Sequence, residues 1–261
     1  MVRIAAIGDL HIRARAPLAL AEQLTDVARR ADVLVVAGDI TDGGRLPEAE
    51  RAAELFRLVS LPIVAVLGNH DRRCLRRAAF RRILEAAGVI LLDGEATVVD
   101  PGGTARVGFA GVAGAGGGFW PDAGPHPLRD RAWQAVAVRA RREAARLDAA
   151  LSGLDADVTV VVTHFAPTAT TLGSEPLAKY WMLGNSELGR VIDRHRVDLV
   201  IHGHAHLGNP DGYTAGGTPV SNVASPVTGG VVVHEVASSP VNLRRRAGVV
   251  WLVGTGTGTT G

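Results

Sequence analysis

The chain has 261 residues, 47% of them hydrophobic, and a formal net charge of +2 at pH 7. These values suit one large domain with a buried core and argue against a nucleic-acid binder, which usually concentrates basic charge on one face. The single cysteine, Cys74, excludes an internal disulfide. Because Met1–Gly8 resembles a strand rather than a signal peptide, and no apolar run approaches the roughly 20 residues that span a bilayer, we expect a cytoplasmic protein without a membrane partner.

The first third of the chain alternates buried strands with amphipathic helices. Strands are predicted at Val2–Gly8, Val33–Gly38 and Ile63–Gly68, since each segment is rich in Val, Ile and Ala and ends at glycine. Helices are predicted at Pro17–Arg30 and Glu48–Val59, where apolar residues recur at spacings of three and four. This β-α-β-α-β order indicates parallel strands joined by right-handed crossovers.

The middle of the chain is predicted to combine helices with short strands. A third helix is expected over Arg72–Ala87, closed by Gly88. Short antiparallel strands are then predicted at Val89–Leu92, Thr97–Val99 and Ala105–Ala110. The glycine-dense stretch Gly111–Gly118 predicts a loop, and Leu128–Leu151 a long helix.

The last third is predicted to return to buried strands. These are expected at Val158–Thr163, Val197–Ile201, Pro219–Ala224 and Gly230–Val236. The helix Ser186–His195 is expected between the first two strands. We assign residues 1–243 to one domain and residues 244–261 to a basic, then Gly/Thr-rich tail that is expected to be partly disordered.

Polar side chains follow five of the predicted strands. They are Asp9 and His11, Asp39, Asn69 with His70 and Asp71, His164, and His204 with His206. Ligands of open α/β sheets bind outside the carboxyl ends of the strands, so these side chains are expected at one edge. Imidazole, carboxylate and amide groups suit Mn²⁺, Fe and Zn²⁺. So many donors exceed what one tetrahedral ion needs and suit two ions that share a carboxylate.

The blocks that carry these residues are Asp-x-His, Gly-Asp-x-x-Asp, Gly-Asn-His-Asp, a lone His and Gly-His-x-His, over residues 9–206. In this order they resemble the calcineurin-like metallophosphoesterase family. The resemblance implies an α/β fold, a four-layer α-β-β-α sandwich of two mixed sheets, with the metal site at the C-terminal ends of the strands. It also implies that a hydroxide between two metal ions attacks a phosphate ester.

The resemblance further implies a role for each matching residue. The first ion would be held by Asp9, His11 and His206, and the second by Asn69, His164 and His204. Asp39 would bridge both ions, because a carboxylate has two oxygen atoms. His70 would stand beside the substrate and stabilise or protonate the leaving group, with Asp71 orienting its ring.

Structural explanations compete with these roles. Asp9 alone could cap a helix, although His11 two residues later is unusual for a cap. His164 alone would be a satisfied structural histidine, but its place after a buried strand favours the ligand. Asp42 is predicted to be a loop residue or a support for a ligand, and His202 to belong to the core or to such a support. Three histidines that match no block are left structural: His126, His195 and His234.

Two further segments lie between the blocks, Gly114–Asp122 and Leu177–Leu183, and both contain aromatic residues. They could form a lid or a base-stacking wall. Alternatively their aromatic rings pack loops onto the core, and this explanation is slightly favoured.

The expected function is hydrolysis of a phosphate ester, with a phosphodiester of a small or nucleotide-like molecule favoured as substrate by analogy. Phosphomonoesterase and protein phosphatase are the alternatives within the family. An inactive binding scaffold would be expected to have lost ligands or His70, and all are present. A nuclease subunit usually carries capping domains for which this chain has little room.

Overall fold

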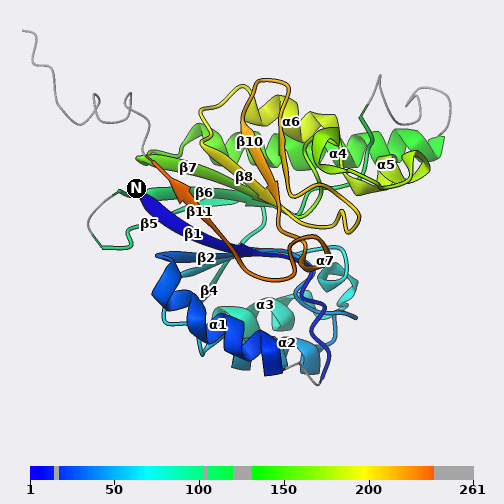
Figure 1. The fold of residues 1–261 in the computed structure, drawn as a ribbon. Coiled ribbons are helices and arrows are strands. Elements are labelled where there is room, and N and C mark those ends of the chain that lie inside the picture. The colour runs from blue at the N-terminus through cyan, green and yellow to red at the C-terminus, as the bar shows by residue number, and fades with distance from the viewer. Residues whose placement is uncertain (15–17, 103–104, 120–130, 238–261) are drawn as a thin grey trace, which may run out of the picture.

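The computed structural model describes residues 1–14, 18–102, 105–119 and 131–237. In these ranges the strands form two sheets that pack face to face, and helices cover the outer face of each sheet (Figure 1). The predicted four-layer α-β-β-α sandwich is thereby confirmed. The predicted tail, residues 244–261, lies outside the described residues.

The first sheet has the strand order β11-β1-β2-β3-β4. Its strands are β1 (Val2–Ile7), β2 (Val33–Ala37), β3 (Ile63–Val66), β4 (Val89–Leu92) and β11 (Val232–Val236). The first four run parallel, and β11 pairs antiparallel with β1. The helices between them are α1 (Leu18–Arg30), α2 (Leu46–Phe56) and α3 (Arg77–Glu85), which lie together on the outer face (Figure 1).

The second sheet has the order β5-β6-β7-β8-β10-β9. Its strands are β5 (Glu95–Val99), β6 (Val107–Val112), β7 (Val158–Thr163), β8 (Leu199–His202), β9 (Asp211–Tyr213) and β10 (Pro219–Asn222). The two outermost strands, β5 and β9, are antiparallel to their neighbours, and the inner strands run parallel.

Two helices cover the second sheet, α4 (Arg131–Ser152) and α6 (Ser186–Ile192). Shorter helical elements are α5 (Tyr180–Leu183), α7 (Ser225–Thr228) and the 3-10 turns Asp71–Arg73, Ala169–Thr171 and Leu177–Lys179. Among the helices that the structure describes, none combines the length and the apolar character that a membrane crossing requires.

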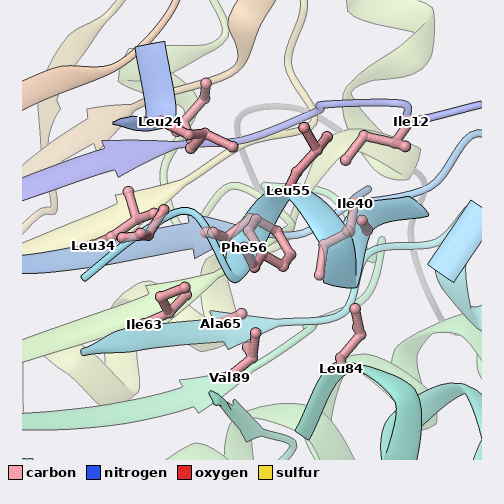
Figure 2. Close-up of a cluster of buried hydrophobic side chains, with 14 of the residues drawn as sticks. Ile12, Leu24, Leu34, Ile40, Leu55, Phe56, Ile63, Ala65, Leu84 and Val89 are labelled. Atoms are coloured by element: carbon pink, nitrogen blue, oxygen red, sulfur yellow. The ribbon is translucent and has the colours of Figure 1, made fainter. Parts of the chain in front are cut away.

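Alternating residues of each central strand are buried on both faces. In β1, Ile4 packs between the two sheets, whereas Ile7 packs under the helices. Figure 2 shows the second of these cores, where Phe56 of α2 lies among side chains of β2, β3 and the neighbouring helices. A strand buried on both faces has no polar side, which is why these segments are continuous runs of apolar residues. Burial of a side chain such as Phe56 contributes on the order of 1.5–3 kcal/mol.

The sequence prediction was wrong at two places. The expected helix Arg72–Ala87 is divided into the 3-10 turn Asp71–Arg73 and α3, and Cys74 between them has an extended backbone with ψ of 119°. Asp71 is held by the loop that follows β2, and this tertiary contact overrides the local helical pattern. The second error concerns β4, which pairs in parallel with β3, because the chain crosses to the other sheet at the following turn instead of forming a hairpin with β5.

Candidate metal centre

The C-terminal ends of five strands meet at one edge of the sandwich. The first sheet contributes the loops after β1, β2 and β3, and the second sheet contributes those after β7 and β8. These loops carry all the residues that were predicted as ligands: Asp9, His11, Asp39, Asn69, His164, His204 and His206. The site therefore straddles both sheets.

One group of donors consists of Asp9, His11 and His206, whose ligand atoms lie within 4.8 Å of one another. Nε2 of His206 lies 2.9 Å and Nε2 of His11 lies 3.9 Å from Oδ1 of Asp9. Both ring nitrogens of His11 are buried and make no hydrogen bond within the described part of the chain. Buried ring nitrogens without a hydrogen bond are costly unless something else binds them, as a metal ion would.

A second group consists of Asp39, His164 and His204, again with ligand atoms within 4.8 Å of one another. Nε2 of His164 lies 3.0 Å from Oδ1 of Asn69, which brings the amide into the same group. The Nδ1 atom of His164 donates a hydrogen bond to the carbonyl of Ala37 at 2.9 Å. Because a carbonyl only accepts, Nδ1 carries the proton in the neutral ring and Nε2 is left to bind a metal.

Asp39 lies between the two groups. Its Oδ1 atom is 3.4 Å from Nε2 of His164, and its Oδ2 atom is 3.9 Å from Nε2 of His11. The backbone N–H of His70 donates to Oδ1 at 2.8 Å and fixes the carboxylate. One oxygen of this carboxylate thus faces each group of donors.

The backbone at four of these residues is in the left-handed region. The φ angles are 55° at Asp9, 43° at His11, 46° at Asp39 and 72° at His204. Such angles are uncommon outside glycine, and clusters of them are typical of functional sites, where packing holds a strained backbone in place.

Two neighbouring glycines leave room for the carboxylates. A Cβ atom on Gly68 would lie 2.0 Å from Oδ1 of Asp39, and one on Gly203 would lie 2.3 Å from Oδ2 of Asp9. Neither distance is possible for a real side chain. Glycine is therefore required at these positions so that the backbone can approach the carboxylate, in addition to any role in the turn.

Charge interactions in the centre oppose the effect of burial. Burial raises the pKa of Asp39, but the charge on His164 and the hydrogen bond between them outweigh it, so the pKa lies below its ordinary value. Burial lowers the pKa of His164, whereas the charge of Asp39 raises it, and the result is a pKa of about 9. Burial, followed by the charge on His164, lowers the pKa of His204 to about 3. Burial raises the pKa of Asp9 as well, but the hydrogen bond from His206 and the charge on His164 outweigh it, so this pKa is also lowered. Lowered pKa values favour the ionised carboxylates that metal ions require.

His70 stands beside Asp39 at the mouth of the site. Its Nε2 atom is 3.9 Å from Oδ2 of Asp39, and about a quarter of its side chain is exposed. Its Nδ1 atom contacts the carbonyl of Asp42, which again assigns the proton of the neutral ring to Nδ1. The guanidinium of Arg73 lies against the ring, 3.2 Å from each nitrogen. Nε2 is therefore the ring nitrogen left for a substrate, which would approach it beside Arg73.

Asp71 is buried behind this residue and binds backbone rather than the ring. Its carboxylate accepts from the N–H groups of Ile40, Thr41 and Gly68 at 2.8–3.1 Å and from the Thr41 hydroxyl at 2.7 Å. The ring of His70 is not among the partners found for it in the described residues. That Asp71 orients His70 stays a prediction. Asp71 can position His70 only through the loops after β2 and β3.

Asp42 has a larger part in the site than the sequence indicated. Besides the carbonyl contact to His70, its Oδ1 atom lies 3.5 Å from Nδ1 of His11, and Oδ2 accepts from Nε of Arg13 at 2.8 Å. His11, Asp42 and His70 form a third group with the spacing of metal ligands. The position of Asp42, three residues after Asp39, is the sequence feature that indicated a role for Asp42 in the site.

Two of the remaining histidines and both aromatic segments have structural partners where they are described. His202 is fully buried and bonded to Thr171, and His195 pairs with Asp148. His234 is half-buried in β11, and His126 lies outside the described residues. In the two aromatic segments, Tyr180 packs edge-on against Phe119 and Trp181 against Trp133, while residues 120–122 are not described.

A comparison with protein families matches residues 2–208 to calcineurin-like phosphoesterases. The chain belongs to the calcineurin-like phosphoesterase family. It is thus a member of a family of metal-dependent hydrolases, and its His and Asp groups lie where a metal could be held. No curated protein matches the chain.

Among solved structures, one crystal structure is 14% identical to this phosphoesterase, covers 90% of this chain and 97% of its own, and superimposes with a TM-score of 0.63. The protein TT1561 of Thermus thermophilus is 20% identical over 85% of this chain and 88% of its own, with a TM-score of 0.49. An archaeal phosphodiesterase is 15% identical over 89% of this chain and 93% of its own, with a TM-score of 0.41. The first of these structures, with the TM-score of 0.63, supports the assignment of the fold.

Proposed function

We propose that this protein hydrolyses phosphate esters with two transition-metal ions, Mn, Fe or Zn, and that a phosphodiester of a small or nucleotide-like molecule is its preferred substrate. One observation carries the proposal. The two oxygens of Asp39 face two separate groups of donors, His164 on one side and His11 on the other. A shared carboxylate between two donor sets suits a pair of ions.

The donor set fits such ions. Asp9, His11 and His206 would hold one ion, Asn69, His164 and His204 would hold the other, and Asp39 would lie between them. When bound, the ions supply Lewis acidity to the phosphoryl group and lower the pKa of a water molecule. The remaining chemistry belongs to side chains of the protein.

His70 would serve the leaving group. Its Nδ1 proton is bound by the Asp42 carbonyl, which orients the ring and leaves Nε2 directed toward the site, 3.9 Å from Asp39. When Nε2 is protonated, it can donate that proton to the departing oxygen. This role requires that the ring of His70 contact the substrate, and the partial exposure of the ring permits this contact.

The charge at the mouth of the site supports the proposed preference for a diester. Arg73 has no carboxylate partner among the described residues, whereas Arg13 is neutralised by Asp42. One guanidinium that contacts the His70 ring and no carboxylate suits a diester phosphate with its single negative charge. A monoester phosphate carries about −1.5 to −2 and would be better matched by a second cation.

The test is hydrolysis by metal-stripped protein after addition of Mn²⁺, Fe²⁺ or Zn²⁺. The substrates are bis-p-nitrophenyl phosphate, p-nitrophenyl phosphate and a set of cyclic nucleotides. We expect activity that depends on added metal and a higher kcat/KM for the diester. If no ester is hydrolysed with any metal, the enzyme assignment fails, and a higher kcat/KM for the monoester would remove the diester preference alone.

A further inference from the structure

Two histidine ligands of the site, His164 and His204, are each oriented by a hydrogen bond to a backbone carbonyl, but the carbonyls come from different parts of the fold. His164 is oriented by the carbonyl of Ala37, which is the last residue of the central strand β2 and is fully buried. His204 is oriented by the carbonyl of Met182 at 3.1 Å, and Met182 belongs to the short helix α5 near the surface. Both histidines are proposed to bind the same ion, so one of its ligands is fixed by the core and another by a surface segment.

The contact with Met182 determines which nitrogen of His204 can bind a metal. Nε2 faces a carbonyl oxygen, and a carbonyl can only accept a hydrogen bond, so Nε2 must carry the proton. Nδ1 is then the free donor. In the neutral ring of His164 the arrangement is the opposite, with the proton on Nδ1, which faces the Ala37 carbonyl, and Nε2 left for the ion. The partner of the non-ligating nitrogen therefore selects a different tautomer for each ligand.

The surface segment that supplies this carbonyl rests on the glycine-rich loop after β6. The N–H of Gly117 donates to the carbonyl of Trp181 at 2.7 Å, and the N–H of Gly118 donates to that of Gly184 at 2.9 Å. A Cβ atom on Gly116 would lie 2.5 Å from the Trp181 oxygen and 3.0 Å from the Cα atom of Met182. Gly116 therefore permits the close approach that places the Met182 carbonyl.

A second contact holds the segment from the side. The ring of Trp181 packs edge-on against Trp133 of α4 with ring centroids 4.8 Å apart. Trp181 is thus turned toward α4, and Met182, 45% exposed, is the next residue along the chain. The two aromatic segments, far apart in the sequence, are therefore in contact in the fold, where Tyr180 also packs edge-on against Phe119.

We propose that Leu177–Leu183 is a positioning segment of the metal centre, in which the Met182 carbonyl holds the Nε2–H tautomer of His204 and so keeps Nδ1 available to the ion. This inference rests on the proposed metal-dependent function. According to this inference, the ion of Asn69, His164 and His204 is bound tightly only when Leu177–Leu183 is in the position seen in the structure. The other ion, at Asp9, His11 and His206, has no ligand in contact with Met182 among the described residues.

The first measurement reads the tautomer in metal-free protein labelled with ¹⁵N-histidine, with His204→Asn used to identify the signal of His204. We expect a protonated Nε2 and an unprotonated Nδ1. A protonated Nδ1 in the wild-type protein would overturn the proposal. This result does not depend on hydrolysis, so it is separate from the test of the proposed function.

The second measurement moves the segment without touching a ligand. Gly116→Ala inserts a methyl group beneath Trp181 and Met182, and Gly153→Ala adds the same methyl group where no atom lies within 4 Å. We expect Gly116→Ala to weaken one of two calorimetric metal-binding steps by about 10–100-fold, the usual effect of losing a partner of a metal-binding histidine, and to leave the other step unchanged. Equal binding by both variants would overturn the proposal.

A further variant serves in case Gly116→Ala does not fold, which circular dichroism would reveal. Trp133→Leu removes the ring that holds Trp181 from the side and adds no atoms near the site. We expect the same metal-binding step to weaken, and the His204 signals to shift toward a mixture of tautomers. Unchanged tautomer and unchanged affinity in Trp133→Leu would show that the segment does not position His204.

Discussion

Nε2 of His206 lies 2.9 Å from Oδ1 of Asp9, although 197 residues separate them in the chain. Asp9 follows β1 of the first sheet, and His206 follows β8 of the second. The contact therefore exists only when the two sheets are packed together. An ion held by both residues would be bound by the folded protein and not by the unfolded chain.

Chelation should accordingly destabilise the protein. A ligand at about 100 times its Kd stabilises the folded state by about 3 kcal/mol, which for a chain of this size corresponds to a fall in Tm of about 5–10 °C when the ligand is removed. Thermal unfolding with and without a chelator, and after metal is restored, measures this. Identical Tm values in all three conditions would show that the centre holds no ion.

Asp39→Asn should disrupt both ion sites at once. The substitution removes the negative charge that lies between His164 and His11 and leaves both groups of donors in place. We expect hydrolysis to be almost abolished and metal content to fall by more than in His206→Ala, which removes a donor from one group only. Asp155→Asn, at a 90% exposed side chain, is the control. Full metal content and near-normal turnover in Asp39→Asn would refute the bridging role.

His70→Asn should slow hydrolysis without loss of metal, because His70 faces the substrate side of the site. The expected cost is about 10²–10⁴-fold, the usual range for general acid catalysis. It should be large for an alkyl ester, whose leaving oxygen needs a proton, and small for a nitrophenyl ester, which leaves as the anion. Kinetics on both substrates with elemental analysis decide the matter. Equal slowing on both, or lost metal, would instead make His70 an electrostatic group or a ligand.

Metal uptake should release protons at neutral pH. The pKa of His164 in the metal-free protein is about 9, so below that pH its ring is protonated and must lose a proton before Nε2 can bind an ion. Apparent affinity should therefore weaken as the pH falls below 9. Calorimetric titration of metal at pH 7 in buffers of different ionisation enthalpy counts the protons. A heat of binding that is independent of the buffer would contradict the assignment of His164 as a ligand.

The ligand residues could be predicted from the sequence because strand ends are visible as apolar runs that stop at glycine or at a polar residue. Five such ends carried Asp, Asn or His, and the structure brings the loops to one edge. The order of the blocks predicted the four-layer fold, since it resembles the pattern of a known family.

Other features had no local signal. The Met182 carbonyl is a backbone group that every residue possesses, so nothing at position 182 indicated a contact with His204. The need for glycine at Gly68 comes from the Asp39 carboxylate, which lies in the loop after another strand, β2. The transfer of the chain from β4 to the second sheet was hidden because Asp93-Gly94 is also a common hairpin turn.

The distance along the chain between the first and last ligands also matters during synthesis. At about 5–20 residues per second, a ribosome needs roughly 10–40 s to add the 197 residues that separate Asp9 from His206. Asp9, His11, Asp39, Asn69 and then His164 are made before His204 and His206, which follow β8. The nascent chain therefore offers an incomplete set of donors, and selection of the metals has to follow the emergence of β8.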